Sequence, residues 1–322
     1  MKLKKILSFF LAAIICFSLC ACEPAEDPSA ISPLLYEVTN ESGGKIWLFG
    51  SIHIGEEYFY PLPRYVLKAY KEAKVLAVEF DLVQYKNNAV AKKRALTALS
   101  YKDGTNTKKY LPESLYEDAI KILKESNLYD EDTEKYYPSA WSNFIDDALY
   151  VKLGIKEELG IDRYFIDQAY KTKKRIEEIE SLEDQYAILA NFSPSLQTSL
   201  LYASVNAYKK ADIEAPKKRM ENWAKGDEAV LAESYKKTTE FSSEQQETLY
   251  NEYHKALVVD RNQKMAEYAE KALLSGEKTF ICVGAAHIIG EGGVVEILSQ
   301  KGYTVKTIRI PKADTENTSS IN

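Results

Sequence analysis

Residues 45–53 read KIWLFGSIH and residues 279–287 read TFICVGAAH. Each stretch is a short apolar run followed by a glycine, two small or aliphatic residues and a histidine. A continuous apolar run of this length is typical of a strand buried on both faces of a sheet. The sequence therefore predicts two buried strands, each ending in a G-x-x-H motif, near opposite ends of the chain.

The first of these strands is expected to have close neighbours along the chain. Residues 34–38 precede it across the turn-rich residues 40–44 (NESGG), which predicts a β-hairpin. Residues 63–73 have apolar side chains at helical spacing, and residues 75–78 (VLAV) form another apolar run. Strand, helix and strand in this order predict a βαβ unit.

The C-terminal part repeats this order. Residues 293–300 predict a short helix and residues 303–310 alternate like a strand. Residues 85–275 are mostly helical in pattern, with a further strand predicted at 175–179. The expected fold class is α/β (α+β), with a mixed central sheet from the N- and C-terminal parts and a large helical middle region.

Two details of the middle region are also predicted. Apolar residues between 115 and 123 mark one amphipathic helix face. Asp260 is expected to N-cap a helix that runs to Leu274 and stops at Gly276.

The N-terminus has the pattern of a bacterial export signal. A basic start, MKLKK, precedes an uncharged apolar run over 6–19, which is shorter than the about 20 residues of a spanning helix. The following LCAC resembles a lipobox and makes Cys22 the expected lipid acceptor; ordinary cleavage and an uncleaved anchor are the alternatives. The predicted location is extracytoplasmic, lipid-anchored to a bacterial membrane.

The expected domains follow from this pattern. Residues 1–21 are a lipoprotein signal peptide, residues 22–33 an acidic proline-containing tether, residues 34–312 the α/β domain and residues 313–322 a disordered tail. After loss of the signal, Cys282 is the only cysteine that carries no lipid, so no internal disulfide is expected.

Composition excludes one class of partner. The 322 residues are 45% hydrophobic and 28% charged, as in ordinary globular proteins. Acidic residues number 48 against 42 basic ones, which gives a formal net charge of −6. A nucleic-acid partner is not expected, because it would need a basic surface.

Three polar residues follow predicted buried strands. His53 and His287 end the G-x-x-H motifs, and Glu79 directly follows residues 75–78. Ligands bind at the carboxyl ends of strands in open α/β sheets. Two neutral imidazoles and a carboxylate are a workable ligand set for a divalent transition metal, here Mn, Co or Zn, with a position left for water. The alternative is that each histidine is a satisfied core residue.

These motifs resemble the signatures of the TraB/GumN (TraB/PrgY) family. GSIHIG at 50–55 with EFD at 79–81 resembles the N-terminal signature, and VGAAHIIG at 283–290 resembles the C-terminal one, although alanine stands where many relatives have a further glycine before His287. Residues 160–162 (GID), 180–185 (ESLEDQ) and 261–262 (RN) fall in the family's order. The resemblance covers about residues 34–310.

The resemblance implies a membrane-tethered metalloprotease of the Tiki type, with His53, Glu79 and His287 as the site. Glu79 then either completes the metal shell or acts as general base. Arg261 is implied as a partner of Glu79 or of a substrate oxyanion, with a structural bridge as the alternative.

Four further residues have weaker patterns. Asp162 and Glu180 are candidate supporting groups; a helix cap is the favoured alternative for Asp162, and a solvated or structurally paired acid for Glu180. His254 is expected on the surface, and Cys282 is expected in the core.

The predicted function is a membrane-anchored, extracytoplasmic, metal-dependent hydrolase, with a peptide as the expected substrate. Two other interpretations stay open. One is a metal-free esterase-like hydrolase in which His53 is the general base that activates water and Glu79 orients the His53 ring. The other is a lipoprotein that binds a peptide, metal or haem without catalysis.

Overall fold

A computed structural model describes residues 27, 29–235 and 241–309 of the chain. The predicted lipid acceptor Cys22, the signal segment 1–21 and the predicted tail 313–322 lie outside the described residues. Among the helices that are described, none combines the length and the apolar character needed to cross a membrane.

Within the described residues, six strands form one mixed sheet in the order β4-β3-β5-β2-β1-β6. Strands β4, β3, β5 and β2 are parallel, whereas β1 is antiparallel to both β2 and β6. The strands are β1 (Leu35–Thr39), β2 (Lys45–Ser51), β3 (Val75–Val78), β4 (Arg175–Glu178), β5 (Thr279–Gly284) and β6 (Thr304–Ile308).

Helices surround this sheet and make up most of the middle of the chain. The described α-helices are α1 (Arg64–Glu72), α2 (Leu82–Asn87), α3 (Ala89–Ala98), α4 (Glu113–Glu125), α5 (Pro138–Lys152), α6 (Ile161–Thr172), α7 (Leu182–Ala190), α8 (Pro194–Lys210), α9 (Glu214–Lys225), α10 (Glu228–Tyr235), α11 (Glu244–His254), α12 (Asp260–Ser275), α13 (Ala285–Ile288) and α14 (Val294–Gln300). Short 3₁₀ helices are η1 (Glu57–Phe59), η2 (Thr107–Tyr110), η3 (Thr133–Lys135) and η4 (Glu157–Leu159), and η5 (Lys255–Val259) is a π-helix.

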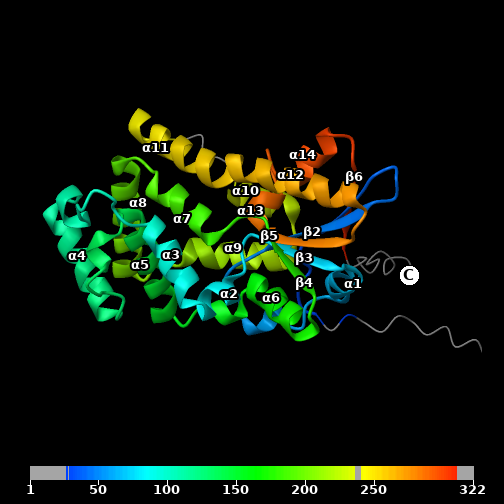
Figure 1. Cartoon of the computed structure of the whole chain (residues 1–322), viewed down its shortest axis with the longest axis horizontal. Coiled ribbons are helices and arrows are strands. Elements are labelled where there is room, and N and C mark those ends of the chain that lie inside the picture. The colour runs from blue at the N-terminus through cyan, green and yellow to red at the C-terminus, as the bar shows by residue number, and fades with distance from the viewer. Residues whose placement is uncertain (1–26, 28, 236–240, 310–322) are drawn as a thin grey trace, which may run out of the picture.

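The sheet lies between two layers of helices (Figure 1). Helix α12 contacts β2 and β5, and α6 contacts β3, β4 and β5. Figure 1 shows α12 and α14 on one side of the sheet and α1 and α6 on the other. Strands buried between two layers need apolar side chains on both faces, which is why β3 is apolar at every position.

The α/β architecture and the mixed sheet confirm the predicted fold class. The hairpin, the helix at α1, the strands β3, β5 and β6 and the helix at α14 all lie within a residue or two of the predicted positions. The strand predicted at 175–179 is confirmed as β4. Two details of the sheet differ from the prediction: β5 lies between the two strands of the predicted βαβ unit, and β4 adds a strand from the middle region to a sheet that was expected from the two ends of the chain.

The predicted cap at Asp260 is wrong. Helix α11 continues through η5 directly into α12, so Asp260 is the first residue of α12 within a continuous helical path and its side chain caps nothing. Its carboxylate accepts hydrogen bonds from Lys255 Nζ at 2.6 and 2.7 Å instead. The predicted stop at Gly276 is confirmed, because this residue has a φ of 73°, which glycine adopts without strain.

Aromatic rings fill the centre of the main core. Phe49 of β2 packs against Phe165, Phe280 and Trp223, with ring centroids 5.7, 5.7 and 6.3 Å away. Trp223 Nε1 also donates to the carbonyl of Gly50 at 2.7 Å. This bond fixes the end of β2 just before His53.

The main core also includes residues that precede the predicted start of the domain. Ile31 is buried in this core, and the Ser32 amide donates to the Ala224 carbonyl at 2.8 Å. Packing therefore begins a few residues before Leu34.

A second, smaller core joins helices α4, α5 and α8. It contains Leu115, Ala119, Ile122 and Leu123 from the predicted amphipathic face of α4, together with Trp141. This cluster stabilises a helical region that projects from the sheet (Figure 1).

We predict that Gly50→Ala lowers the free energy of unfolding by about 1–3 kcal/mol, because an added methyl overpacks a filled site. A Cβ at Gly50 would lie 2.9 Å from Ala285 Cα, so β2 and α13 would have to separate. Urea unfolding measures the change. The exposed Ser42→Ala is the control and should stay within about 0.5 kcal/mol of the parent. Equal stability of both variants would contradict the prediction.

Candidate functional site

The sheet order brings the three predicted site residues to one edge. Strand β5 is parallel to β2 on one side and to β3 on the other, with Ser51 paired to Gly284 and Val78 to Cys282. His53, Glu79 and His287 each follow one of these three strands. They therefore leave the sheet at its carboxyl edge, as the sequence predicted.

Gly284 lies at the point on which the three side chains converge. A Cβ built on it would lie 3.2 Å from Glu79 Oε1, 3.5 Å from His287 Cδ2 and 4.0 Å from His53 Nε2. The two imidazoles and the carboxylate thus surround one backbone position. Glycine leaves this space to them.

His53 is oriented by a buried carboxylate. Its Nδ1 lies 2.8 Å from Asp162 Oδ2, and Asp162 Oδ1 accepts from Ser51 Oγ at 2.5 Å. Asp162 is only 7% exposed, whereas the His53 side chain is 67% exposed. With Nδ1 bound to the carboxylate, Nε2 is the ring atom available to a ligand.

Asp162 is therefore a supporting residue of the site and not the cap of its helix. The backbone of Gly160 occupies the N-cap position of α6, and no side chain caps this helix. The carboxylate points to β2 because Ser51 and His53 offer it two hydrogen bonds, which offset the cost of its burial. The cap interpretation, favoured from sequence, is wrong.

His287 is oriented by the side-chain amide of Asn262, for which the sequence predicted no role. Its Nδ1 lies 2.7 Å from Asn262 Oδ1, and Asn262 Nδ2 donates to the Gly292 carbonyl at 2.8 Å. Because the amide nitrogen is used by Gly292, the oxygen faces His287 and must accept from Nδ1–H. His287 therefore also presents an unprotonated Nε2 when it is neutral.

Glu79 is held by three donors. Oε1 accepts from the Gly284 amide at 2.8 Å, and Oε2 accepts from Arg261 Nη2 at 2.6 Å and from Gln185 Nε2 at 3.0 Å. Glu79 is only 7% exposed. The predicted pairing of Glu79 with Arg261 is present. Gln185 is a further partner, to which the sequence pattern of residues 180–185 assigned no role.

Arg261 also binds Glu180, which lies beside Glu79. The Glu180 amide donates to the Glu79 carbonyl at 3.0 Å, so the pairing of β3 and β4 continues to these two residues. Arg261 Nε and Nη2 contact the Glu180 carboxylate at 2.9 and 2.7 Å. Glu180 is a buried ion-pair partner and not a solvated acid.

These contacts separate the pKa values of the two histidines. The Asp162 carboxylate raises the pKa of His53 to about 9, so this ring is protonated at neutral pH when it has no other ligand. Burial lowers the pKa of His287 to about 4, so this ring is neutral. Burial alone raises the pKa of Glu79, but Arg261, the two histidines and the Gly284 amide together hold it well below its usual range.

Both imidazoles are oriented in the way that is usual for metal-binding histidines. Metal-binding histidines usually donate the second ring N–H to a carboxylate or amide oxygen, as His53 and His287 do here. Across residues 27, 29–235 and 241–309, no group of three or more His, Cys, Asp or Glu side chains is arranged to hold a metal ion. The arrangement thus offers two nitrogen donors, with the Glu79 oxygens already engaged.

The two remaining candidates, His254 and Cys282, are not among the side chains that converge at Gly284. His254 ends α11 and is half-buried, with its ring 5.6 Å from that of Tyr250. Cys282 is a free, buried residue of β5, as expected.

The fold and the site define an α/β protein with a histidine and carboxylate cluster at the carboxyl edge of its parallel strands. The sequence model of the TraB/PrgY/gumN family matches residues 34–307. The chain belongs to this family. Comparisons with curated proteins and with solved structures gave no significant match.

We predict that Arg261→Met lowers the free energy of unfolding by about 3–5 kcal/mol at neutral pH, because two adjacent carboxylates would stay buried without a cation. Denaturant unfolding measures the loss. Adding Glu180→Gln should restore part of it. The exposed Arg175→Met, which breaks the surface pair with Glu277, should cost about 1 kcal/mol or less. A loss at Arg261 no larger than at Arg175 would contradict the buried network.

We further predict that Asp162→Asn moves the pKa of His53 from about 9 toward the ordinary value of about 6.5. Because the folded-state pKa is raised, the His53–Asp162 pair stabilises the fold fully below about pH 6.5 and loses this effect as the pH rises through 9. Histidine NMR titration of the metal-free parent and of Asp162→Asn measures the pKa of His53 in each protein. The pKa of His287 is the internal control and should stay near 4. A parent His53 that titrates near 6.5 would contradict the assignment.

Proposed function

We propose that this member of the TraB/PrgY/gumN family is a metal-dependent hydrolase that acts on peptides. One observation carries the proposal. Two histidines from adjacent parallel strands surround Gly284, and each has its Nδ1 bound to a buried side chain, so that both Nε2 atoms are available.

In this proposal, His53 and His287 hold the metal through Nε2. Asp162 and Asn262 fix the two rings and their tautomers before any ligand arrives, which reduces the ordering that binding requires. A metal bound there supplies a Lewis acid and a water of lowered pKa. Binding must release the proton of His53, because only the neutral ring is a ligand, so metal affinity should rise with pH toward 9.

Glu79 is proposed to act in the cluster through its negative charge. Its three hydrogen bonds and its low pKa make it a poor proton acceptor at neutral pH. The carboxylate instead offsets the positive charge of a metal and of Arg261. The sequence predicted that Glu79 is either a general base or a metal ligand. Its hydrogen bonds favour neither role, because both carboxylate oxygens already accept from donors of the protein. A charge-balancing role fits these contacts best.

The exposure of His53 supports a reaction on a large substrate. This side chain is 67% exposed although it belongs to the cluster, whereas His287 is 6% exposed. A polymer such as a peptide could therefore approach the His53 side of the site. The peptide class itself rests on the resemblance of the motifs to those of membrane-tethered metalloproteases.

We also propose that the protein acts outside the cytoplasm, anchored to a bacterial membrane by lipid on Cys22. The support is the sequence of residues 1–22, with its basic start, apolar run and LCAC. The acidic, proline-containing residues up to 33 would then separate the lipid from the fold.

A metal-free hydrolase is the second candidate. The 2.8 Å contact between His53 Nδ1 and Asp162 favours it, because a carboxylate-oriented imidazole is also the arrangement of a general base. The pKa of His53, raised to about 9, opposes it at neutral pH because the ring would be protonated there. Such an enzyme would work best in alkaline solution.

The first test is metal content. The full chain, purified without a histidine tag, is loaded separately with Mn, Co and Zn, desalted and subjected to elemental analysis. We expect about one equivalent of one metal in the parent, and loss of it in His53→Ala and His287→Ala, because each variant removes one of two nitrogen donors. His254→Ala is the matched control and should keep the metal.

The same samples then digest a mixture of peptides that is read by mass spectrometry. Cleavage that stops with a chelator and returns with metal supports the proposal. Cleavage that survives chelation and is lost in Asp162→Asn would favour the metal-free candidate. A folded parent that takes up no metal and cleaves nothing would contradict both.

A further inference from the structure

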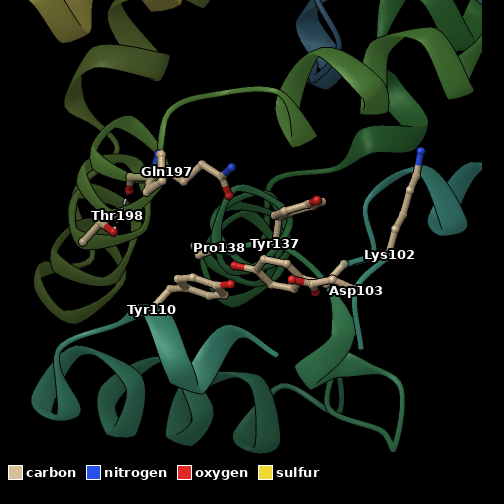
Figure 2. A pocket seen from close by; sticks show the side chains of 9 residues that line it. Lys102, Asp103, Tyr110, Tyr137, Pro138, Gln197 and Thr198 are labelled. Atoms are coloured by element: carbon tan, nitrogen blue, oxygen red, sulfur yellow. Dashed lines mark hydrogen bonds between the residues drawn. The ribbon is translucent and has the colours of Figure 1, made fainter. Parts of the chain in front are cut away.

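A second concave site lies in the helical region, on elements that do not contribute to the histidine cluster. It is a pocket of about 360 Å³ between the loop around Tyr101, η2, the start of α5 and the start of α8 (Figure 2). This volume lies in the range of small-ligand sites. Nothing in the proposed function uses it.

Tyrosine rings form one wall of the pocket. Tyr101 stacks on Tyr110 with centroids 5.1 Å apart, and it also contacts Tyr137 at 4.2 Å. The face of a tyrosine ring attracts cations and flat groups. One cation is already present at the edge of this cluster, since Lys109 Nζ lies 5.5 Å from the Tyr110 centroid.

The opposite wall has a buried acceptor without a donor. Gln197 is 4% exposed and lines the pocket from α8. Its Nε2 donates to the Phe192 carbonyl at 2.8 Å, but Oε1 has no hydrogen-bond partner among the described residues. Figure 2 shows the amide oxygen turned toward the tyrosines. Because an unsatisfied buried acceptor costs about 1–3 kcal/mol, a donor from a ligand would be favoured here.

The other polar groups of the pocket include acceptors as well as the donating hydroxyls of the tyrosines. Asp103 lies at its rim with a carboxylate that Thr105 holds through Oδ1. The Thr198 hydroxyl already donates to the Pro194 carbonyl at 2.8 Å. Lys102 extends away from the tyrosines in Figure 2. The pocket therefore offers flat aromatic faces, a negative charge and an unused acceptor.

We propose that this pocket binds a guanidinium group, carried either by an arginine of a peptide or by a small molecule. A guanidinium is planar, stacks on aromatic rings, has five N–H donors and has no acceptor that would need a donor from the protein. Its N–H groups match two acceptors of the pocket, Gln197 Oε1 and the Asp103 carboxylate. A neutral sugar could also use the tyrosine hydroxyls, but it would leave the negative charge of Asp103 without a partner.

Calorimetry on the full chain tests the proposal with N-acetyl-arginine methylamide as the probe. N-acetyl-citrulline methylamide is the matched control ligand, since it has the same shape without the charge. We expect binding of the arginine compound and about two- to fivefold weaker binding of the citrulline compound, because water screens a pair with the exposed Asp103 carboxylate. Agmatine and an arginine-containing hexapeptide then show whether the small-molecule or the peptide form binds more tightly.

Two variants locate the binding. Asp103→Asn keeps the oxygen that Thr105 uses but removes the charge, and it should weaken binding about two- to fivefold. Gln197→Met removes the unpaired acceptor and should weaken binding about tenfold. Asp167→Asn, which removes a charge on α6, is the control and should bind like the parent. Thermal unfolding shows whether Gln197→Met still folds, and if it does not, Asp103→Asn decides.

The proposal would be overturned by equal binding of the citrulline compound, by unchanged binding in Asp103→Asn, or by no binding of any guanidinium compound at millimolar concentration. Binding of a neutral sugar in place of the arginine compound would overturn it too. None of these results depends on metal content or peptide cleavage, so the guanidinium site and the proposed hydrolase succeed or fail separately.

Discussion

The site depends on one buried ion pair network, in which the guanidinium of Arg261 lies between Glu79 and Glu180. The parallel pairing of β3 and β4 forces the two carboxylates side by side, because the Glu180 amide continues the ladder at the Glu79 carbonyl. Two adjacent buried negative charges are tolerated only with a cation between them. Helix α12 supplies this cation and is thereby fixed against the sheet.

The same helix orients one histidine through the next residue along the chain. Arg261 holds Glu79, while Asn262 holds His287 and the Gly292 carbonyl. Because the two residues are neighbours, any displacement of α12 would disturb the carboxylate and the imidazole together. The first turn of α12 follows η5 without a break, so its position depends on the packing of the preceding helix rather than on a local cap.

The two histidines share a fold position but differ in environment. His53 is exposed and bound to a carboxylate, which favours its charged form, whereas His287 is buried and bound to a neutral amide, which favours its neutral form. Two identical motifs on parallel strands thus yield one cationic and one neutral ring. An asymmetry of this kind is common at functional sites, where neighbouring groups need different protonation states. The helical region has a separate core, so its tyrosine pocket is built independently of these charges.

The strands, the edge of the sheet at which the site lies and its three central residues, His53, Glu79 and His287, could be predicted from the sequence alone. Apolar runs before Glu79 and before the two G-x-x-H motifs are local signals, and the sheet edge at which they meet follows from parallel pairing. Which side chains hold His53, Glu79 and His287 in place depends on the tertiary structure. Asp162 was expected to cap its own helix but lies against His53, and Asn262 and Gln185 reach the cluster from helices distant in sequence from the residues that they hold. A local pattern reports burial and periodicity, but a hydrogen bond between residues far apart in the chain depends on how the elements pack, and no spacing in the sequence encodes that.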